Sequence, residues 1–140
     1  MTMPVTTPMT WVTIVIALAL LQFMGFGIAV GWARDKYQVH APATTGNAVF
    51  ERYFRVQMNT LEQLVVFLPS IWLFAHQVNA TWAAGLGAVY LIGRLVYFRS
   101  YTRDPKSRGL GFLLTGLPTM IMVAGVLIAA VIRLLGQLRA

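Results

Sequence analysis

Long, predominantly apolar stretches constrain this chain more than any other feature of its sequence. No charged side chain occurs from Met1 to Ala33, and further apolar stretches follow at about 50–74, 82–98 and 109–132. Each is close to the ~20 residues that a helix needs to cross a bilayer. The sequence therefore predicts an all-α integral membrane protein, a four-transmembrane-helix bundle in a single domain (1–140). We expect the spans at about 11–33, 50–74, 82–98 and 109–132.

The composition supports this class and excludes others. Hydrophobic residues make up 58% of the chain and charged residues 11%, whereas soluble domains carry about 25% charged residues. The net charge of +7 arises from short connections and span ends, so we expect no nucleic-acid partner. The sequence contains no cysteine, which excludes a disulfide, a thiolate metal site and a cysteine nucleophile. The histidines His40 and His76 lie far apart in the sequence, so we expect no metal site.

The basic residues also predict an orientation. They concentrate in the connections after the first and third spans, whereas the segment before the first span and the connection between the second and third carry none. Cytoplasmic connections of multi-pass proteins are enriched in Lys and Arg. We therefore expect these connections to face the cytoplasm, although Arg133 and Arg139 favour the opposite orientation. The expected membrane is a bacterial inner membrane or the endoplasmic reticulum. Because the N-terminus lacks a basic segment typical of signal peptides, we expect the first span to be retained.

A polar stripe interrupts the second apolar stretch. Arg55, Asn59 and Glu62 follow one another at i, i+4 and i+7, so in a helix they fall within an arc of roughly 60°. Charged residues at membrane depth are costly and usually face a partner, a cavity or a ligand. A guanidinium, an amide and a carboxylate together suit a small zwitterionic ligand. The alternative is a buried structural ion pair between Arg55 and Glu62.

The third stretch carries a second stripe, and single arginines lie at two span ends. The stripe is spaced at i, i+4, i+7 and i+11 and consists of Tyr90, Arg94, Tyr97 and Tyr101. Arg34 ends the first span and Arg108 begins the fourth. These groups could bind carboxylates and peptide bonds. The alternatives are that the tyrosines pack in the core and that Arg108 is a solvated loop charge.

Two segments resemble a known family. The segment TTGNAVFERYFRVQMNTLE (44–62) resembles the MAPEG family, the membrane-associated proteins in eicosanoid and glutathione metabolism, and the similarity continues through RLVYFRSY (94–101) to Arg108. It is closest to the leukotriene-C synthase and microsomal glutathione transferase members. The resemblance implies a homotrimer with one glutathione site at each subunit interface, facing the cytoplasm.

The resemblance also implies roles for individual residues. Arg108 matches the arginine that activates the glutathione thiol in the family. The residues that match the family's glutathione contacts are Arg34, Arg55, Gln57, Asn59, Glu62, Tyr97 and Tyr101. A guanidinium suits this activation because it stays cationic and stabilises a thiolate beside it. Since the chain has no cysteine, the nucleophile would come from the bound cofactor, glutathione.

The implied activity is glutathione transfer to hydrophobic electrophiles that reach the site from membrane lipid, with reduction of lipid hydroperoxides as a related activity. A non-catalytic lipid-binding scaffold and a glutathione-dependent isomerase are the alternatives within the family. Two positions depart from the family pattern. Asp35 replaces an arginine that is proposed to protonate the leaving oxygen in leukotriene synthesis, and Gln63 replaces a tyrosine beside the glutathione site. Leukotriene synthesis is therefore disfavoured, and one glutathione contact is expected to change.

Overall fold

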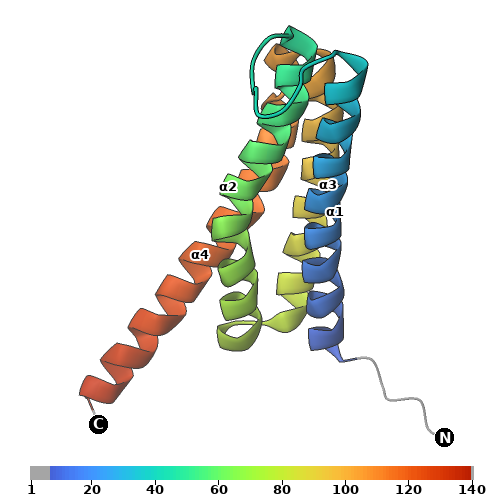
Figure 1. Cartoon of the computed structure of the whole chain (residues 1–140). Helices are drawn as coiled ribbons and strands as arrows, with labels where there is room; N and C mark the ends of the chain where they lie inside the picture. Colours follow the sequence, from blue (N-terminus) through green and yellow to red (C-terminus); the bar gives the residue numbers. More distant parts are fainter. Residues whose placement is uncertain (1–6, 140) are drawn as a thin grey trace, which may run out of the picture.

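Four long helices account for most of the chain (Figure 1). The computed structural model describes residues 7–139, and its helices are α1 (Pro8–Lys36), α2 (Ala48–Gln77), α3 (Ala80–Arg103) and α4 (Gly109–Leu138), with a short 3₁₀ helix, η1 (Pro105–Ser107), before α4. All four long helices are long and apolar enough to cross a membrane. The predicted all-α class is confirmed, and each predicted span lies within one helix.

Short polar segments separate the helices and fix where they begin. The side chain of Asn47 accepts hydrogen bonds from the backbone N–H groups of Val49 and Phe50 at the start of α2. Asn79 accepts one from Trp82 at the start of α3. Both caps satisfy backbone donors that a first helical turn leaves unpaired. Because α2 and α3 are joined by so few residues, they must run antiparallel.

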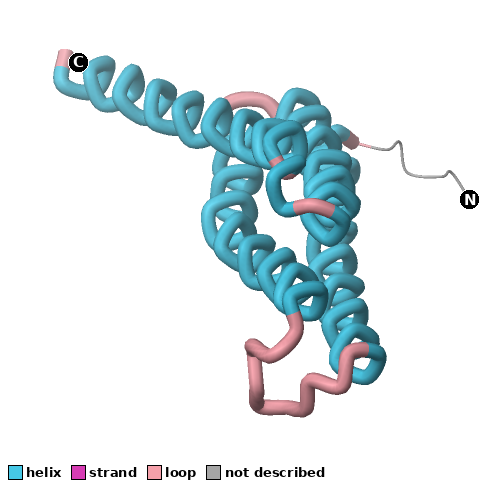
Figure 2. Tube along the Cα trace, turned by 90° about the horizontal axis from the view of Figure 1, so that it is seen from above, coloured by secondary structure: helices cyan, strands magenta, loops and turns pink. Residues whose placement is uncertain are grey.

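The helices form a bundle with one divergent member. α1, α2 and α3 pack against one another, and α4 packs on α2 and α3. Towards its C-terminal end α4 leans away from the other helices (Figures 1 and 2), and residues 131–139 are all exposed. The main core cluster is drawn from all four helices and includes Val12, Phe67, Ile71, Tyr90 and Met122.

Glycine allows α3 and α4 to approach closely near the start of α4. A Cβ on Gly111 would lie 2.5 Å from the Cα and the N of Tyr97, and a Cβ on Gly93 would lie 2.7 Å from the backbone carbon of Leu114. Neither position has room for a side chain, because the neighbouring atoms belong to backbone. This contact places the residues that begin α4 directly beside the end of α3.

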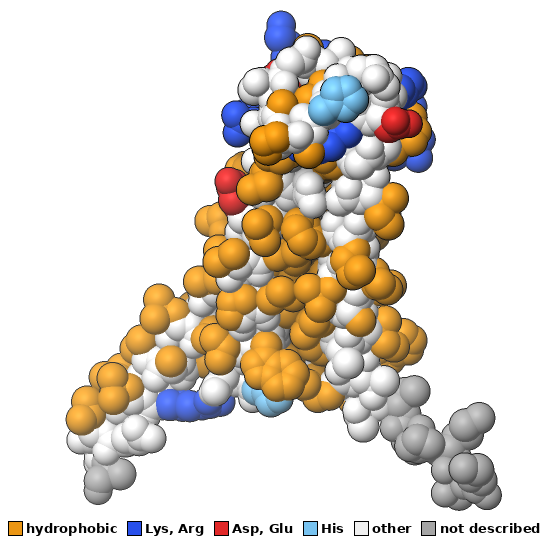
Figure 3. All heavy atoms as spheres, in the orientation of Figure 1, with side chains coloured by type: hydrophobic (Ala, Val, Ile, Leu, Met, Phe, Trp, Pro, Cys, Tyr) orange, Lys and Arg blue, Asp and Glu red, His pale blue; other side chains and the backbone are white. Residues whose placement is uncertain are grey.

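The surface divides by chemistry along the bundle. In the view of Figure 3, most of the charged side chains gather at the end formed by the α1–α2 connection and the turn into α4, whereas hydrophobic side chains cover much of the bundle below. Exposed hydrophobic residues of all four helices include Leu21, Val65, Ile92 and Leu127. Such a surface suits a hydrocarbon environment, in which apolar side chains have no reason to be buried.

Candidate active site

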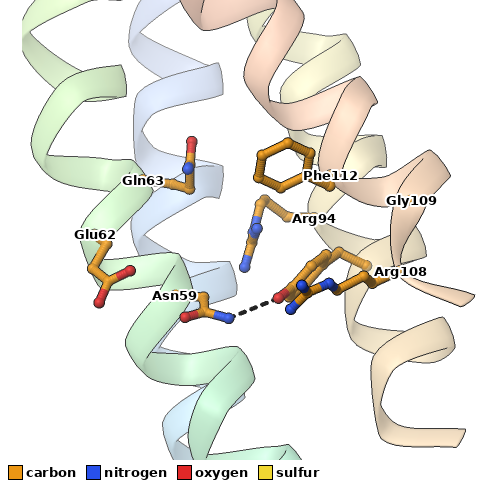
Figure 4. Close-up of a pocket in the computed structure, with 8 residues that line it drawn as sticks. Asn59, Glu62, Gln63, Arg94, Arg108, Gly109 and Phe112 are labelled. Carbon is orange, nitrogen blue, oxygen red and sulfur yellow. Dashed lines mark hydrogen bonds between the residues drawn. The ribbon is translucent and has the colours of Figure 1, made fainter. Parts of the chain in front are cut away.

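A pocket of about 330 Å³ opens between α2, α3 and the start of α4. It lies near the charged end of the bundle. The residues that line it are Asn59, Glu62, Gln63, Arg94, Tyr97, Arg108, Gly109 and Phe112. In Figure 4, Asn59, Arg94 and Arg108 lie around one space, and Glu62 lies at its far edge. The pocket therefore brings together residues from both polar stripes and from the start of α4.

Helix α2 contributes two members of its predicted stripe. The side-chain amide of Asn59 donates a hydrogen bond of 2.7 Å to the hydroxyl of Tyr97, shown as the dashed line in Figure 4. Glu62 lines the pocket, and its carboxylate is exposed. Arg55, the third member, is exposed and lies outside the pocket. Within one subunit Arg55 and Glu62 do not form a buried ion pair, because both side chains are exposed.

Helix α3 contributes an aromatic and cationic wall. Tyr97 is 3% exposed and Arg94 only 1%. The guanidinium carbon of Arg94 lies 4.3 Å from the centroid of the Tyr97 ring, and the Tyr97 and Tyr101 rings stack with centroids 5.4 Å apart. Tyr90 behaves differently: it is fully buried and stacks on Phe67. The packing interpretation is thus correct for Tyr90, whereas Tyr97 lines the pocket.

Arg108 lies at the N-terminus of α4. Its side chain lines the pocket and is exposed, and its guanidinium carbon lies 6.0 Å from the centroid of the Tyr101 ring. Gly109, the first residue of α4, lines the same pocket. Helix N-termini carry partial positive charge, so this end of α4 and the guanidinium both favour an anion. Arg108 is thus an exposed residue that lines the pocket.

Arg34 and Gln57 lie elsewhere in the subunit. The guanidinium of Arg34 donates to the backbone carbonyls of Val39 (3.3 Å) and Ala43 (2.6 Å) in the α1–α2 connection. It borders a separate pocket of about 230 Å³, together with Asp35. The amide nitrogen of Gln57 faces α1, 2.9 Å from where a Cβ on Gly27 would lie. Within one subunit, neither side chain lines the pocket between α2, α3 and α4.

The structure also places residues in the pocket that the sequence did not assign to it. Gln63 was noted only as a departure from the family pattern, and Gly109 and Phe112 gave no signal beyond their proximity to Arg108. Arg94 did give one, because it is a charged residue inside a membrane-spanning stretch and shares an arc with Tyr97. Its spacing from Tyr97 groups it with the second polar stripe, although the resemblance does not match it to a glutathione contact.

The fold and the pocket define a multi-pass α-helical membrane protein with a polar site near one end of the bundle. A sequence model of the MAPEG family matches residues 11–128, and the chain belongs to that family. Membership and the four apolar helices together make it an integral membrane protein. The resemblance noted in the sequence is thereby confirmed.

The chain is also similar in sequence to individual proteins, over different shares of its length. An uncharacterized protein from Synechocystis sp. is 48% identical over 133 residues, which are 95% of this chain and 94% of that protein. Microsomal glutathione S-transferase 2 from Homo sapiens is 39% identical over 111 residues, 79% of this chain and 76% of the human protein. Leukotriene C4 synthase from Bos taurus is 39% identical over 83 residues, 59% of this chain and 55% of the bovine protein.

Proposed function

We propose that the chain is a glutathione transferase of the membrane, which conjugates glutathione to hydrophobic electrophiles and also reduces lipid hydroperoxides. One observation carries the proposal: Asn59, Tyr97 and Arg108, from three helices, converge on a single pocket that Glu62 also lines. Similarity to a glutathione S-transferase and a leukotriene C4 synthase supports the same reaction class.

The lining of the pocket is complementary to a tripeptide zwitterion. Glutathione carries carboxylates, an ammonium group, peptide bonds and a thiol. The carboxylate of Glu62 suits the ammonium group, and the amide of Asn59 and the hydroxyl of Tyr97 suit peptide groups. Guanidinium groups bind carboxylates and stabilise a thiolate. A purely lipid ligand would offer the charged groups of Glu62 and Arg108 no partner, which is unfavourable.

Arg108 is the residue to which we assign thiol activation. A thiol must ionise before it attacks, and a guanidinium beside the sulfur lowers the thiol pKa, at about 1.4 kcal/mol for each unit. The thiol proton leaves to water. The thiolate electron pair then forms the bond to the electrophilic carbon, and the leaving group departs with its bonding electrons. An apolar electrophile can reach the pocket from the bilayer past Phe112, which is 60% exposed at its edge.

The positions of Arg34 and Gln57 support a homotrimer with sites at the subunit interfaces. Both match glutathione contacts of the family, yet both lie on the α1 side of α2, away from the pocket. Arg55 and Glu62 are exposed on α2 and would face lipid or headgroups in a monomer, which is unfavourable for charged side chains within the membrane. A neighbouring subunit would cover these groups and would bring its own Arg34 and Gln57 to the ligand.

Mixed assemblies test the shared site. We expect Arg34→Ala and Arg108→Met each to reduce conjugation strongly when all subunits carry the same change. Coexpressing the two variants should restore part of the activity, because an interface that takes Arg34 from one chain and Arg108 from the next is intact. If the conjugation activity of the mixed assemblies is no higher than the average of the two single-variant assemblies, a site shared between subunits is contradicted.

A thiolate measurement tests the function itself. Glutathione added to the purified protein in lipid nanodiscs should produce the ultraviolet absorption of a bound thiolate, and Arg108→Ala should weaken this absorption at neutral pH, because the thiol pKa then rises. Arg103→Ala is the matched control, since Arg103 is an exposed arginine at the end of α3 that lies outside this pocket. Absence of the thiolate signal from the unmodified protein would overturn the proposal.

Turnover separates the alternatives. The protein should conjugate glutathione to members of a panel of hydrophobic electrophiles, and a panel of lipid hydroperoxides tests the reduction separately. Glutathione binding without turnover of any of them would instead support a scaffold. Because Asp35 replaces the arginine associated with leukotriene synthesis, an allylic epoxide should be among the poorer substrates.

A further inference from the structure

Arg94 is the largest fully buried side chain among the described residues. It lies in the membrane-spanning part of α3 and is 1% exposed. One of its terminal nitrogens donates to the hydroxyl of Thr60 at 2.5 Å and to the backbone carbonyl of Val56 at 3.5 Å. Its Nε is buried and has no hydrogen-bond partner within residues 7–139.

The surroundings of Arg94 leave its charge uncompensated. Its contacts are a hydroxyl, a carbonyl and the face of the Tyr97 ring, and all of these groups are neutral. Buried arginines are normally paired with a carboxylate, since an isolated buried charge is strongly unfavourable. Across the described residues no carboxylate forms an ion pair with it, and Glu62 lies at the far edge of the pocket (Figure 4). A bound anion would compensate this charge.

Arg94 borders the deeper part of the pocket. It precedes Tyr97 by three residues, so it lies about 4.5 Å further along α3 from the charged end of the bundle. Figure 4 shows its side chain between Gln63 and Phe112 on one side and Asn59 and Arg108 on the other. The pocket thus faces two cations, one buried and one exposed.

We propose that Arg94 is a second cation of the glutathione site, which acts through space to stabilise the negative charge on the bound sulfur. The inference rests on the proposed function, because it takes the ligand to be glutathione. The charged and titratable groups that line the pocket are Arg94 and Tyr97 of α3, Glu62 of α2 and Arg108 before α4. Arg94 is shielded from water, so its field is weakened less by solvent and salt than that of the exposed Arg108.

A structural role for Arg94 makes a different prediction. Its hydrogen bonds join α3 to α2 through Thr60 and Val56, so removing it would loosen this helix pair whatever its charge does. Thr60→Val removes the strongest of these hydrogen bonds and leaves the charge in place. Arg94→Met removes the charge and replaces the aliphatic part of the side chain with an unbranched apolar one. The two variants therefore separate the charge from the contact.

The experiment is a pH titration of the thiolate absorption of bound glutathione. For Arg94→Met we expect the midpoint to rise by about one pH unit, the size expected for one charge at short range. Thr60→Val and Arg94→Lys should stay close to the unmodified protein, because both retain a cation. A midpoint in Arg94→Met equal to that of the unmodified protein would overturn the inference, as would an equal rise in Thr60→Val.

A second measurement applies if Arg94→Met fails to fold. In Arg108→Met the buried cation remains, so the midpoint should stay below that of free glutathione and should change little between low and high ionic strength. A midpoint equal to that of free glutathione, or one that reaches it at high salt, would also overturn the inference. Failure of the proposed function is distinct, since the unmodified protein would then show no bound thiolate at any pH.

Discussion

Replacing Gly111 with alanine tests whether the contact between α3 and α4 sets the position of Arg108. The added Cβ would lie 2.5 Å from two backbone atoms of Tyr97, whereas ordinary contact begins at 3.4 Å. Since backbone cannot move aside as a flexible side chain can, the helices must separate locally by roughly 0.9 Å, the difference between these distances. Such overpacking typically costs about 1–3 kcal/mol.

The same displacement should impair catalysis. Gly111 lies one turn of α4 beyond Arg108, so moving this turn also moves the guanidinium relative to Tyr97. A misplacement of about 1 Å can reduce a rate by roughly 10²-fold. We therefore expect a lower melting temperature and a 10- to 100-fold loss in kcat/KM for conjugation, measured by thermal unfolding in detergent and by a glutathione conjugation assay.

Gly116→Ala is the matched control for this prediction. Gly116 also lies inside α4, but a Cβ there would meet no atom within 4 Å. Alanine favours a helix interior over glycine by about 0.5–1 kcal/mol, so this variant should be as stable as the unmodified protein or more so, and fully active. If Gly111→Ala behaves like Gly116→Ala in both assays, the close contact does not position Arg108 and the reasoning fails.

Three further predictions concern individual side chains. Asn59→Ala and Tyr97→Phe should each weaken glutathione binding, and a double-mutant cycle by calorimetry should give a coupling of about 0.5–1.5 kcal/mol, because they remove the same hydrogen bond. Glu62→Gln should weaken glutathione binding about tenfold. It should leave the affinity for a glutathione analogue without the amino group unchanged. An equal loss of affinity for both ligands would contradict the pairing of Glu62 with the ammonium group. Asn79→Ala should lower stability by about 1 kcal/mol through loss of the α3 cap while leaving kcat/KM unchanged, since the cap lies at the opposite end of α3 from the pocket.

The helices could be predicted from the sequence because the thickness of the bilayer sets the length of the apolar stretch that a spanning helix needs. Their ends were less accessible. The fourth span was expected to end before Arg133, yet α4 continues to Leu138. The side chain of Arg133 donates a hydrogen bond of 2.8 Å to the backbone carbonyl of Gln77, the last residue of α2. A long basic side chain can thus satisfy an unpaired carbonyl of a neighbouring helix, a contact that depends on tertiary structure.

Helical periodicity located the pocket residues only in part. It correctly placed Asn59 and Glu62 on one face, and it placed Arg55 on the same face although the pocket does not extend that far. Angular position is a property of one helix, whereas the length of a pocket depends on how α3 and α4 pack against it. Helical spacing groups Arg94 with Tyr97, but its burial beside the pocket depends on how the helices pack and could be established only from the structure.

The angular separation of Gln57 and Asn59 bears on assembly. Because these two residues are two positions apart in a helix, their side chains are related by a rotation of about 200° about the helix axis and point in nearly opposite directions. The structure accordingly places Gln57 against α1 and Asn59 against Tyr97. A ligand held within one subunit cannot contact both. If both bind glutathione, as their match to the family implies, they must belong to different chains at each site. The opposite directions of these two side chains thus make a subunit interface a requirement if both contact the same ligand.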